Sequence, residues 1–146
     1  MRKSIYLAAP LFSMAERTFN GELALRLEEN ADVFLPQRDG RLIIDLLDEG
    51  FDVEQAKRLI FERDVDALQR SDIVLGVLDG RVIDEGVAVE LALGYAFKKI
   101  CWGLKTDFRS LCWFGDNPMV EVLIGRRFET VDAVVVAVQS ARWAEA

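Results

Sequence analysis

Short apolar segments alternate with longer amphipathic segments along this chain. Continuous apolar runs are typical of strands buried on both faces of a sheet, and they occupy Ile5–Ala9, Val33–Leu35, Ile73–Leu78 and Ile100–Leu104. Apolar residues at helical spacing predict helices over residues 13–30, 52–70, 87–97 and 131–143, with a short helical segment over 120–124. This alternation indicates an α/β protein with a parallel sheet.

Local signals mark the start of two of these helices. Ser13 and Glu16 have the spacing of a capping box, which predicts that the first helix begins at Ser13. Asp52 is the expected N-cap of the second helix. Right-handed crossovers then favour a doubly wound, flavodoxin-like (Rossmann-like) sheet of about five strands, with helices on both faces and ligands beyond the carboxyl ends of the strands. No linker or repeat interrupts the pattern, so we expect residues 1–146 to form a single domain.

Composition restricts the chemistry open to this chain. Its 146 residues include 25 acidic and 18 basic side chains, and a net charge of −7 repels a phosphate backbone. We therefore expect no nucleic acid polymer as a partner. Histidine is absent, which excludes every catalytic triad, general base and metal site that would use a histidine. Any acid–base or nucleophilic work must fall to carboxylates, tyrosine or cysteine.

Several common classes of protein lack support in the sequence. Cys101 and Cys112 lie in apolar settings without CxxC spacing, so we interpret them as reduced packing residues of a cytoplasmic protein. The first apolar stretch breaks at Pro10 and is too short for a signal peptide or a membrane span. Neither G-x-G-x-x-G nor a P-loop motif is present, which disfavours dinucleotide oxidoreductases and P-loop phosphotransferases. No ligand set is complete, and we expect no metal or organic cofactor.

Four carboxylates follow the expected central strand: Asp79, Asp84, Glu85 and Glu90. Glu90 lies about one turn inside the next helix, between apolar neighbours, so desolvation should raise its pKa while the helix N-terminus lowers it. A solvated acidic loop, including one of calcium-binding appearance, is the alternative for this cluster. Glu90 fits that alternative least, because an isolated glutamate in an apolar helix seldom serves packing.

Segments along nearly the whole chain, from about residue 4 to 138, together resemble the nucleoside 2-deoxyribosyltransferases. They are IYLAAPLF at 5–12, FLPQR at 34–38, SDIV at 71–74 leading into LDG at 78–80, and Asp84-x-Gly86-x-x-x-Glu90 followed by Gly94-Tyr95-Ala96. The resemblance implies transfer of 2-deoxyribose between nucleobases, through a covalent glycosyl-glutamate intermediate and with net retention. The expected partners are therefore small molecules, 2′-deoxynucleosides and free nucleobases.

The resemblance assigns the catalytic roles to three side chains. Glu90 takes the position of the family nucleophile, and its carboxylate would trap the oxocarbenium-like sugar as an ester. Tyr6 would donate a hydrogen bond to Glu90 and hold it ionised, although a tyrosine in a core strand is the structural alternative. Asp84 would face the sugar hydroxyls or the base and take part in proton delivery to the leaving nitrogen.

The resemblance also implies substrate-binding roles. Phe12 would stack on the base, Gln37 would read its edge, and Asp64 would lie near it. Gly86 would permit close approach of the sugar. Asn117 resembles an asparagine that a neighbouring subunit lends to the 5′-hydroxyl, which implies a homo-oligomer, a dimer or larger, with shared active sites. The structural alternatives are an exposed helix residue for Asp64, an ordinary loop residue for Gln37 and a turn residue for Asn117.

The sequence departs from the family pattern behind the nucleophile. Relatives usually carry glycine two residues after the glutamate, whereas here it is Gly94, four residues after Glu90. We therefore expect different helix packing behind Glu90.

Two other functions remain open. An N-glycosidase would hydrolyse 2′-deoxynucleosides or their 5′-monophosphates by the same covalent route, and a nucleotide-sensing α/β module would be non-catalytic. Pro10 has no amide to offer a phosphate, and Asn117 suits an uncharged 5′-hydroxyl, so the transferase is favoured.

Overall fold

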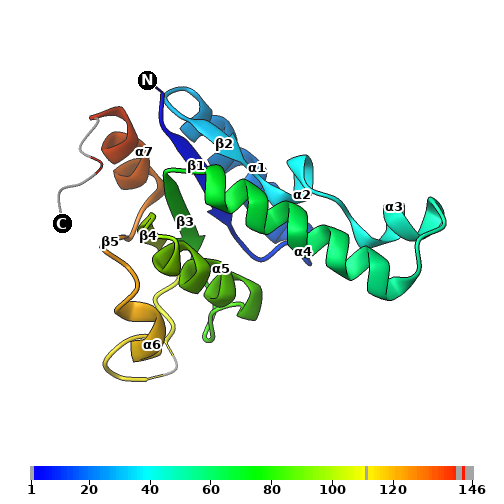
Figure 1. The fold of residues 1–146 in the computed structure, drawn as a ribbon. Coiled ribbons are helices and arrows are strands. Elements are labelled where there is room, and N and C mark those ends of the chain that lie inside the picture. The colour runs from blue at the N-terminus through cyan, green and yellow to red at the C-terminus, as the bar shows by residue number, and fades with distance from the viewer. Residues whose placement is uncertain (1, 111, 141–142, 144–146) are drawn as a thin grey trace.

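The computed structural model describes residues 2–110, 112–140 and 143 and is built around a five-stranded parallel sheet (Figure 1). The strands are β1 (Ser4–Ala8), β2 (Asp32–Phe34), β3 (Ile73–Val77), β4 (Ile100–Leu104) and β5 (Arg126–Phe128). They pair in the order β2-β1-β3-β4-β5, and every pair is parallel. The predicted flavodoxin-like α/β fold is thus confirmed.

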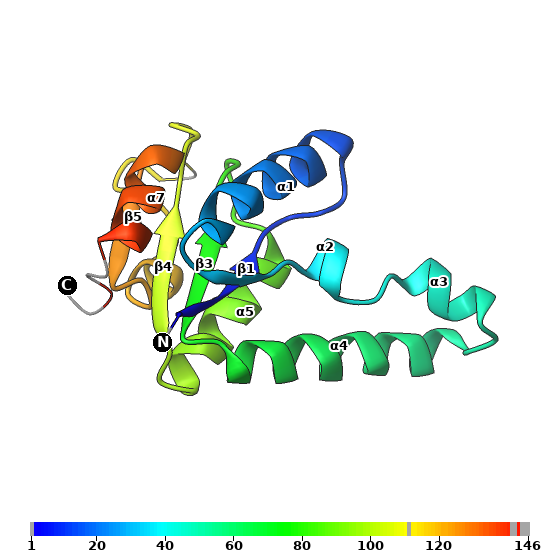
Figure 2. The ribbon, with the colours of Figure 1, turned by 90° about the horizontal axis from the view of Figure 1, so that it is seen from above.

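Helices cover both faces of the sheet. One face packs against α1 (Met14–Glu28) and α7 (Val131–Gln139), and the other against α4 (Val53–Arg70), α5 (Glu85–Ala96) and α6 (Pro118–Glu121). Two short helices, α2 (Pro36–Asp39) and α3 (Ile43–Asp48), connect β2 to α4. Figure 2 shows α3 and the first half of α4 projecting together, away from the sheet.

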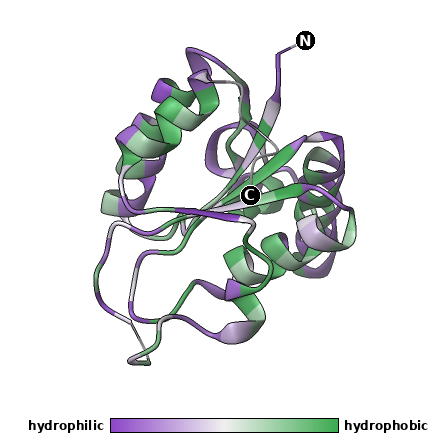
Figure 3. Cartoon of the chain, turned by 90° about the vertical axis from the view of Figure 1, so that its left-hand side faces the viewer, coloured by the Kyte–Doolittle hydropathy of each residue, from purple (hydrophilic) through white to green (hydrophobic). Residues whose placement is uncertain are grey.

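The period of two along a strand divides the core into two layers. Ile5 and Leu7 join the layer beneath α1 and α7, whereas Tyr6 and Ala8 join the layer beneath α4 and α5. In Figure 3 the apolar colour gathers on the strands and on the helix sides turned toward them. The alternation places the Tyr6 hydroxyl on the face that α4 and α5 cover.

The local signals in the sequence are confirmed. The Ser13 hydroxyl accepts from the amide of Glu16, and the Glu16 carboxylate accepts from the amide of Ser13, as a capping box requires. Asp52 caps α4 in the same way, with Gln55 as its reciprocal partner. The predicted fourth strand, Ile100–Leu104, has the bounds of β4.

Three elements were not predicted: α2, α3 and β5. The helices α2 and α3 have only four and six residues, too few to show a helical period. The edge strand β5 is three residues long and begins with two arginines, so it forms no apolar run. The predicted last helix is shorter than expected, because α7 ends at Gln139; its expected course over 141–142 falls outside the described residues.

Two further observations bear on the protein's setting. In the part of the chain that the structure describes, no helix combines the length and the apolar character needed to cross a bilayer. Cys101 is buried and Cys112 is partly buried, and both are free thiols. Burial raises the pKa of the Cys101 thiol to about 11, which suits a packing role and not that of a nucleophile.

Candidate active site

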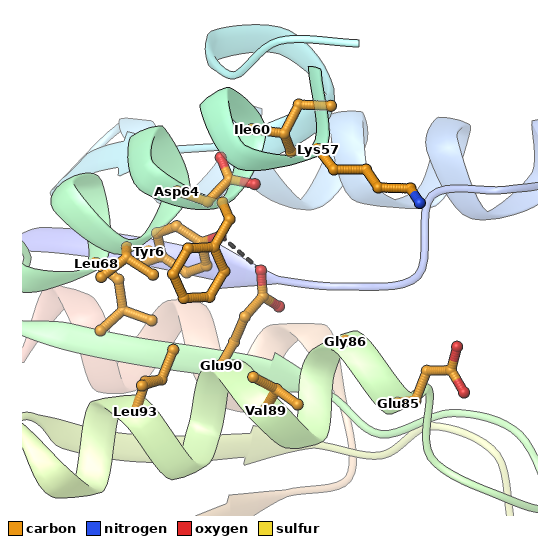
Figure 4. A pocket seen from close by; sticks show the side chains of 12 residues that line it. Tyr6, Lys57, Ile60, Asp64, Leu68, Glu85, Gly86, Val89, Glu90 and Leu93 are labelled. Atoms are coloured by element: carbon orange, nitrogen blue, oxygen red, sulfur yellow. Dashed lines mark hydrogen bonds between the residues drawn. The ribbon is translucent and has the colours of Figure 1, made fainter. Parts of the chain in front are cut away.

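A cavity of about 590 Å³ lies between α4 and α5, with β1 at its floor (Figure 4). Its volume is in the usual range for small-molecule sites. Most of its walls are apolar and come from the facing sides of the two helices. The residues that line it are Tyr6, Lys57, Ile60, Phe61, Asp64, Val65, Leu68, Glu85, Gly86, Val89, Glu90 and Leu93.

A short hydrogen bond joins two predicted catalytic residues inside this cavity. The Tyr6 hydroxyl donates to Glu90 Oε1 at 2.6 Å. Tyr6 is fully buried in β1 and stacks on Phe34 of β2, with ring centroids 5.5 Å apart, so the direction of its hydroxyl is determined by packing. Figure 4 shows the Glu90 side chain rising from α5 to meet this hydroxyl.

The environment of Glu90 favours its protonated form. The pKa of Glu90 is raised to about 8: burial raises it most, the hydrogen bond from Tyr6 opposes the shift, and the negative charges of Asp64 and Asp84 add to it. The pKa of Tyr6 is also raised, chiefly by burial and then by Glu90 and Asp64, so the phenol keeps its proton and remains the donor. A carboxyl group that titrates near neutral pH in a cavity is a common property of catalytic sites.

Asp64 faces Glu90 from the opposite wall. Burial raises the pKa of Asp64 to about 6, with Arg63 opposing the shift. Its Oδ1 is buried and has no hydrogen-bond partner among the described residues. An unpaired buried carboxylate oxygen is costly. This one lies beside Gly40, where an added Cβ would be 3.2 Å from it, although Asp64 as a residue also lines the cavity. Asp64 is therefore not exposed, as its structural alternative assumed, but half-buried in the cavity wall.

Asp84 and Gly86 lie at the start of α5. Asp84 is the N-cap, and its Oδ2 accepts from the amide of Val87 at 3.1 Å. A side chain at Gly86 would approach that same Oδ2, at 3.0 Å from its Cβ, and Gly86 itself lines the cavity. Asp84 does not line the cavity, but its charge reaches Glu90.

Three of the predicted binding residues do not line this cavity. The Gln37 amide bridges two groups of α1, since it donates to the Arg17 carbonyl and accepts from Asn20. Phe12 is 76% exposed on the loop after β1. Asn117 caps α6 by accepting from the amide of Met119, and it lines a separate small cavity.

The acidic cluster expected after the central strand is dispersed in the structure. Asp79 accepts from the amides of Thr106 and Asp107 and from the Thr106 hydroxyl, so it holds the loop after β4. Glu85 is exposed at the cavity rim. No three cysteine or acidic side chains of residues 2–110, 112–140 and 143 come together as a metal site would require.

The sequence interpretation found only Asp64 of the wall that α4 contributes. Lys57, Phe61, Asp64 and Leu68 recur at intervals of three and four residues, so they share one helix face. Phe61 supplies an aromatic ring that lines the cavity and is 58% exposed. The spacing of these residues around Asp64 shows in the sequence that they share a helix face, but it does not show what that face contacts.

A family model described as Nucleoside 2-deoxyribosyltransferase matches residues 5–138 of this chain. A search of curated proteins with this chain finds no match.

Solved structures share the fold. A conserved protein from Enterococcus faecalis V583 aligns with a TM-score of 0.81 and 24% identity, over 96% of this chain and 99% of that one. A 2-deoxyribosyltransferase from Bacillus psychrosaccharolyticus aligns with a TM-score of 0.72 and 21% identity, over 90% of each chain. A CMP N-glycosidase from Clostridium botulinum aligns with a TM-score of 0.55 and 16% identity, over 94% of this chain and 98% of that one.

Proposed function

Because the chain belongs to the nucleoside 2-deoxyribosyltransferase family, we propose that it exchanges the nucleobase of 2′-deoxynucleosides through an ester formed on Glu90. The observation that supports this most is the Tyr6–Glu90 hydrogen bond of 2.6 Å inside an apolar cavity, opposite Asp64. The arrangement offers a carboxylate nucleophile, a donor that orients it and a second carboxyl group across the cavity.

In the first step, Glu90 attacks C1′ of the deoxynucleoside. A carboxylate oxygen forms a bond to C1′ as the bond from C1′ to the base nitrogen breaks, and the bonding pair leaves with the base. The hydrogen bond from Tyr6 favours the ionised form of Glu90 that this attack requires. A proton must reach the departing base, and Asp64 lines the cavity opposite Glu90, so we assign this proton to the Asp64 carboxyl group: the reactive form has Glu90 ionised and Asp64 protonated.

In the second step, a nitrogen of another base attacks C1′ from the side that the first base left. The ester bond breaks, Glu90 recovers its carboxylate, and the proton of the incoming base passes to the Asp64 carboxylate. Two inversions at C1′ give net retention. Asp84 acts at the sugar end, where its charge lies near Glu90. Phe61 offers the ring on which a base stacks, the role expected of Phe12 from the sequence.

The position of Asn117 favours sites shared between subunits. Asn117 caps α6 away from the cavity of its own chain, so it can assist a 5′-hydroxyl only in the cavity of another copy. The helices α3 and α4 also expose apolar side chains where they project from the sheet, among them Ile43, Ile44 and Val53. We therefore propose a homo-oligomer with shared sites.

The charges around the cavity favour an uncharged nucleoside over a nucleotide. Among the described residues that line it, Asp64, Glu85 and Glu90 are acidic and Lys57 alone is basic. Lys57 already pairs with Glu54 at 2.7 Å. A 5′-phosphate would therefore meet more negative than positive charge, which argues against a nucleotide hydrolase.

The deciding experiment incubates the protein with deoxyinosine and adenine and separates the products by chromatography. New deoxyadenosine supports transfer, whereas free hypoxanthine and deoxyribose without exchange would support the N-glycosidase. No turnover of deoxyinosine or of deoxynucleoside monophosphates would contradict both enzymatic functions and favour a nucleotide-sensing module.

The role of Glu90 is tested in the same assay. Glu90→Ala should lower exchange about a thousandfold or more, as loss of a covalent nucleophile does. Glu22→Ala, an exposed change on α1 on the other face of the sheet, is the matched control and should keep exchange unchanged. Full activity in Glu90→Ala would remove Glu90 from its proposed role.

A further inference from the structure

We propose that Gly94 is a positioning residue, which lets α5 lie close against the sheet and thereby sets the reach of Glu90 toward Tyr6. The inference rests on the proposed role of Glu90 and adds to it the element that places the nucleophile.

The contact beneath Gly94 leaves no room for a side chain. A Cβ at Gly94 would lie 2.8 Å from Val74 Cγ2 on β3 and 3.2 Å from Cys101 Sγ on β4. Both neighbours are buried in the layer beneath α5. An ordinary contact would require about 0.6 Å more separation from Val74, so a methyl group here must lift the helix or displace the strand.

A second glycine makes the same fit from the opposite side. Gly76 of β3 lies under Leu91, and a Cβ at Gly76 would come within 2.9 Å of Leu91 Cδ1. Leu91 is fully buried. Gly94 of α5 thus lies over Val74 of β3, and Gly76 of β3 lies under Leu91 of α5. These two contacts together set the distance between α5 and β3.

The face of α5 explains why the glycine is at 94. Val87, Leu91 and Gly94 are the buried residues of this helix and lie at intervals of four and three, toward the sheet. Ala92, two residues before Gly94, is exposed. A glycine there would open no space beneath α5 in this chain, whereas Gly94 does.

The height of α5 controls the surroundings of Glu90. Glu90 precedes Gly94 by four residues, about one helical turn. Its carboxyl group is faced by Tyr6 from β1, by Asp64 from α4 and by Asp84 from the N-cap of α5. Lifting the helix lengthens the 2.6 Å bond from Tyr6, which is the contact that lowers the pKa of Glu90.

Gly94→Ala is therefore expected to lower kcat about tenfold to a hundredfold, the effect of a misplacement approaching 1 Å, with a much smaller change in KM. The acid limb of the pH profile of kcat should move to higher pH. Gly94→Ala combined with Val74→Ala removes the closest contact and should recover much of kcat and return the acid limb. Gly21→Ala is the matched control, since a Cβ at Gly21 of α1 meets nothing within 4 Å.

Titration of the ¹³C-labelled Glu90 carboxyl group by NMR measures the same effect without turnover. Exchange absent from the wild-type protein would defeat the proposed function, while the NMR titration would still test the positioning. A Glu90 titration in Gly94→Ala equal to that of the wild type, or no recovery in the double variant, would overturn the inference. If Gly94→Ala does not fold, Gly76→Ala takes its place, with Leu91→Ala as the compensating change.

Discussion

Replacing Glu90 with glutamine should stabilise the folded chain while it removes the proposed nucleophile. The pKa of Glu90 is raised from 4.5 to about 8, because burial outweighs the opposing hydrogen bond from Tyr6. Between these two pH values the folded state holds a proton that the unfolded chain has released. The stability that this proton confers is complete below the unfolded pKa and is lost as pH rises through the folded pKa.

The size of the effect follows from the width of this window. Each pH unit inside it costs about 1.4 kcal/mol, so the penalty at pH 7 is about 3 kcal/mol relative to pH 4.5. Glutamine has the same shape and keeps an oxygen that can accept from Tyr6, but it never ionises. The gain from Glu90→Gln should therefore be about 3 kcal/mol at pH 7 and near zero at pH 4.5.

Urea unfolding of both proteins at several pH values between 4.5 and 8 measures this difference. Glu22→Gln, an exposed change on the far side of the sheet, should leave the pH dependence of the wild type unaltered. A difference between Glu90→Gln and the wild type that stays constant over this range would refute the argument, because the stabilisation would then not come from ionisation.

Three further results are expected. Tyr6→Phe removes a charge-assisted hydrogen bond worth about 1.5 kcal/mol or more, so the pKa of Glu90 should rise by about one unit; kcat at pH 7 should fall about tenfold and recover at higher pH, and an unmoved acid limb would contradict this. Gly21→Ala, in open space on α1, should raise the free energy of unfolding by about 0.5–1 kcal/mol in urea. Lys105→Met breaks the buried bond to Asp116 at 2.9 Å and should lower the free energy of unfolding in urea by about 3 kcal/mol; an unchanged value would contradict this and show that Arg127 alone satisfies Asp116.

Much of the fold was predictable because its signals are local. The capping box at Ser13, the N-cap at Asp52 and buried runs such as Ile100–Leu104 depend on residues a few positions apart, and the structure confirms them. The elements that were missed, such as β5, are too short or too polar to show a period. Arg126 and Arg127 in that strand pair with β4 through backbone bonds, which no side-chain pattern reveals.

The order of the longer helices and strands, and the pairing of Tyr6 with Glu90 through the family resemblance, could be read from the sequence alone. Which other side chains meet this pair depends on the tertiary structure. It places the face of α4 that carries Phe61 and Asp64 over Tyr6, while the Gln37 amide binds α1 instead. The physical reason is that periodicity shows which residues share a face, whereas the packing of two helices on one sheet decides what that face contacts.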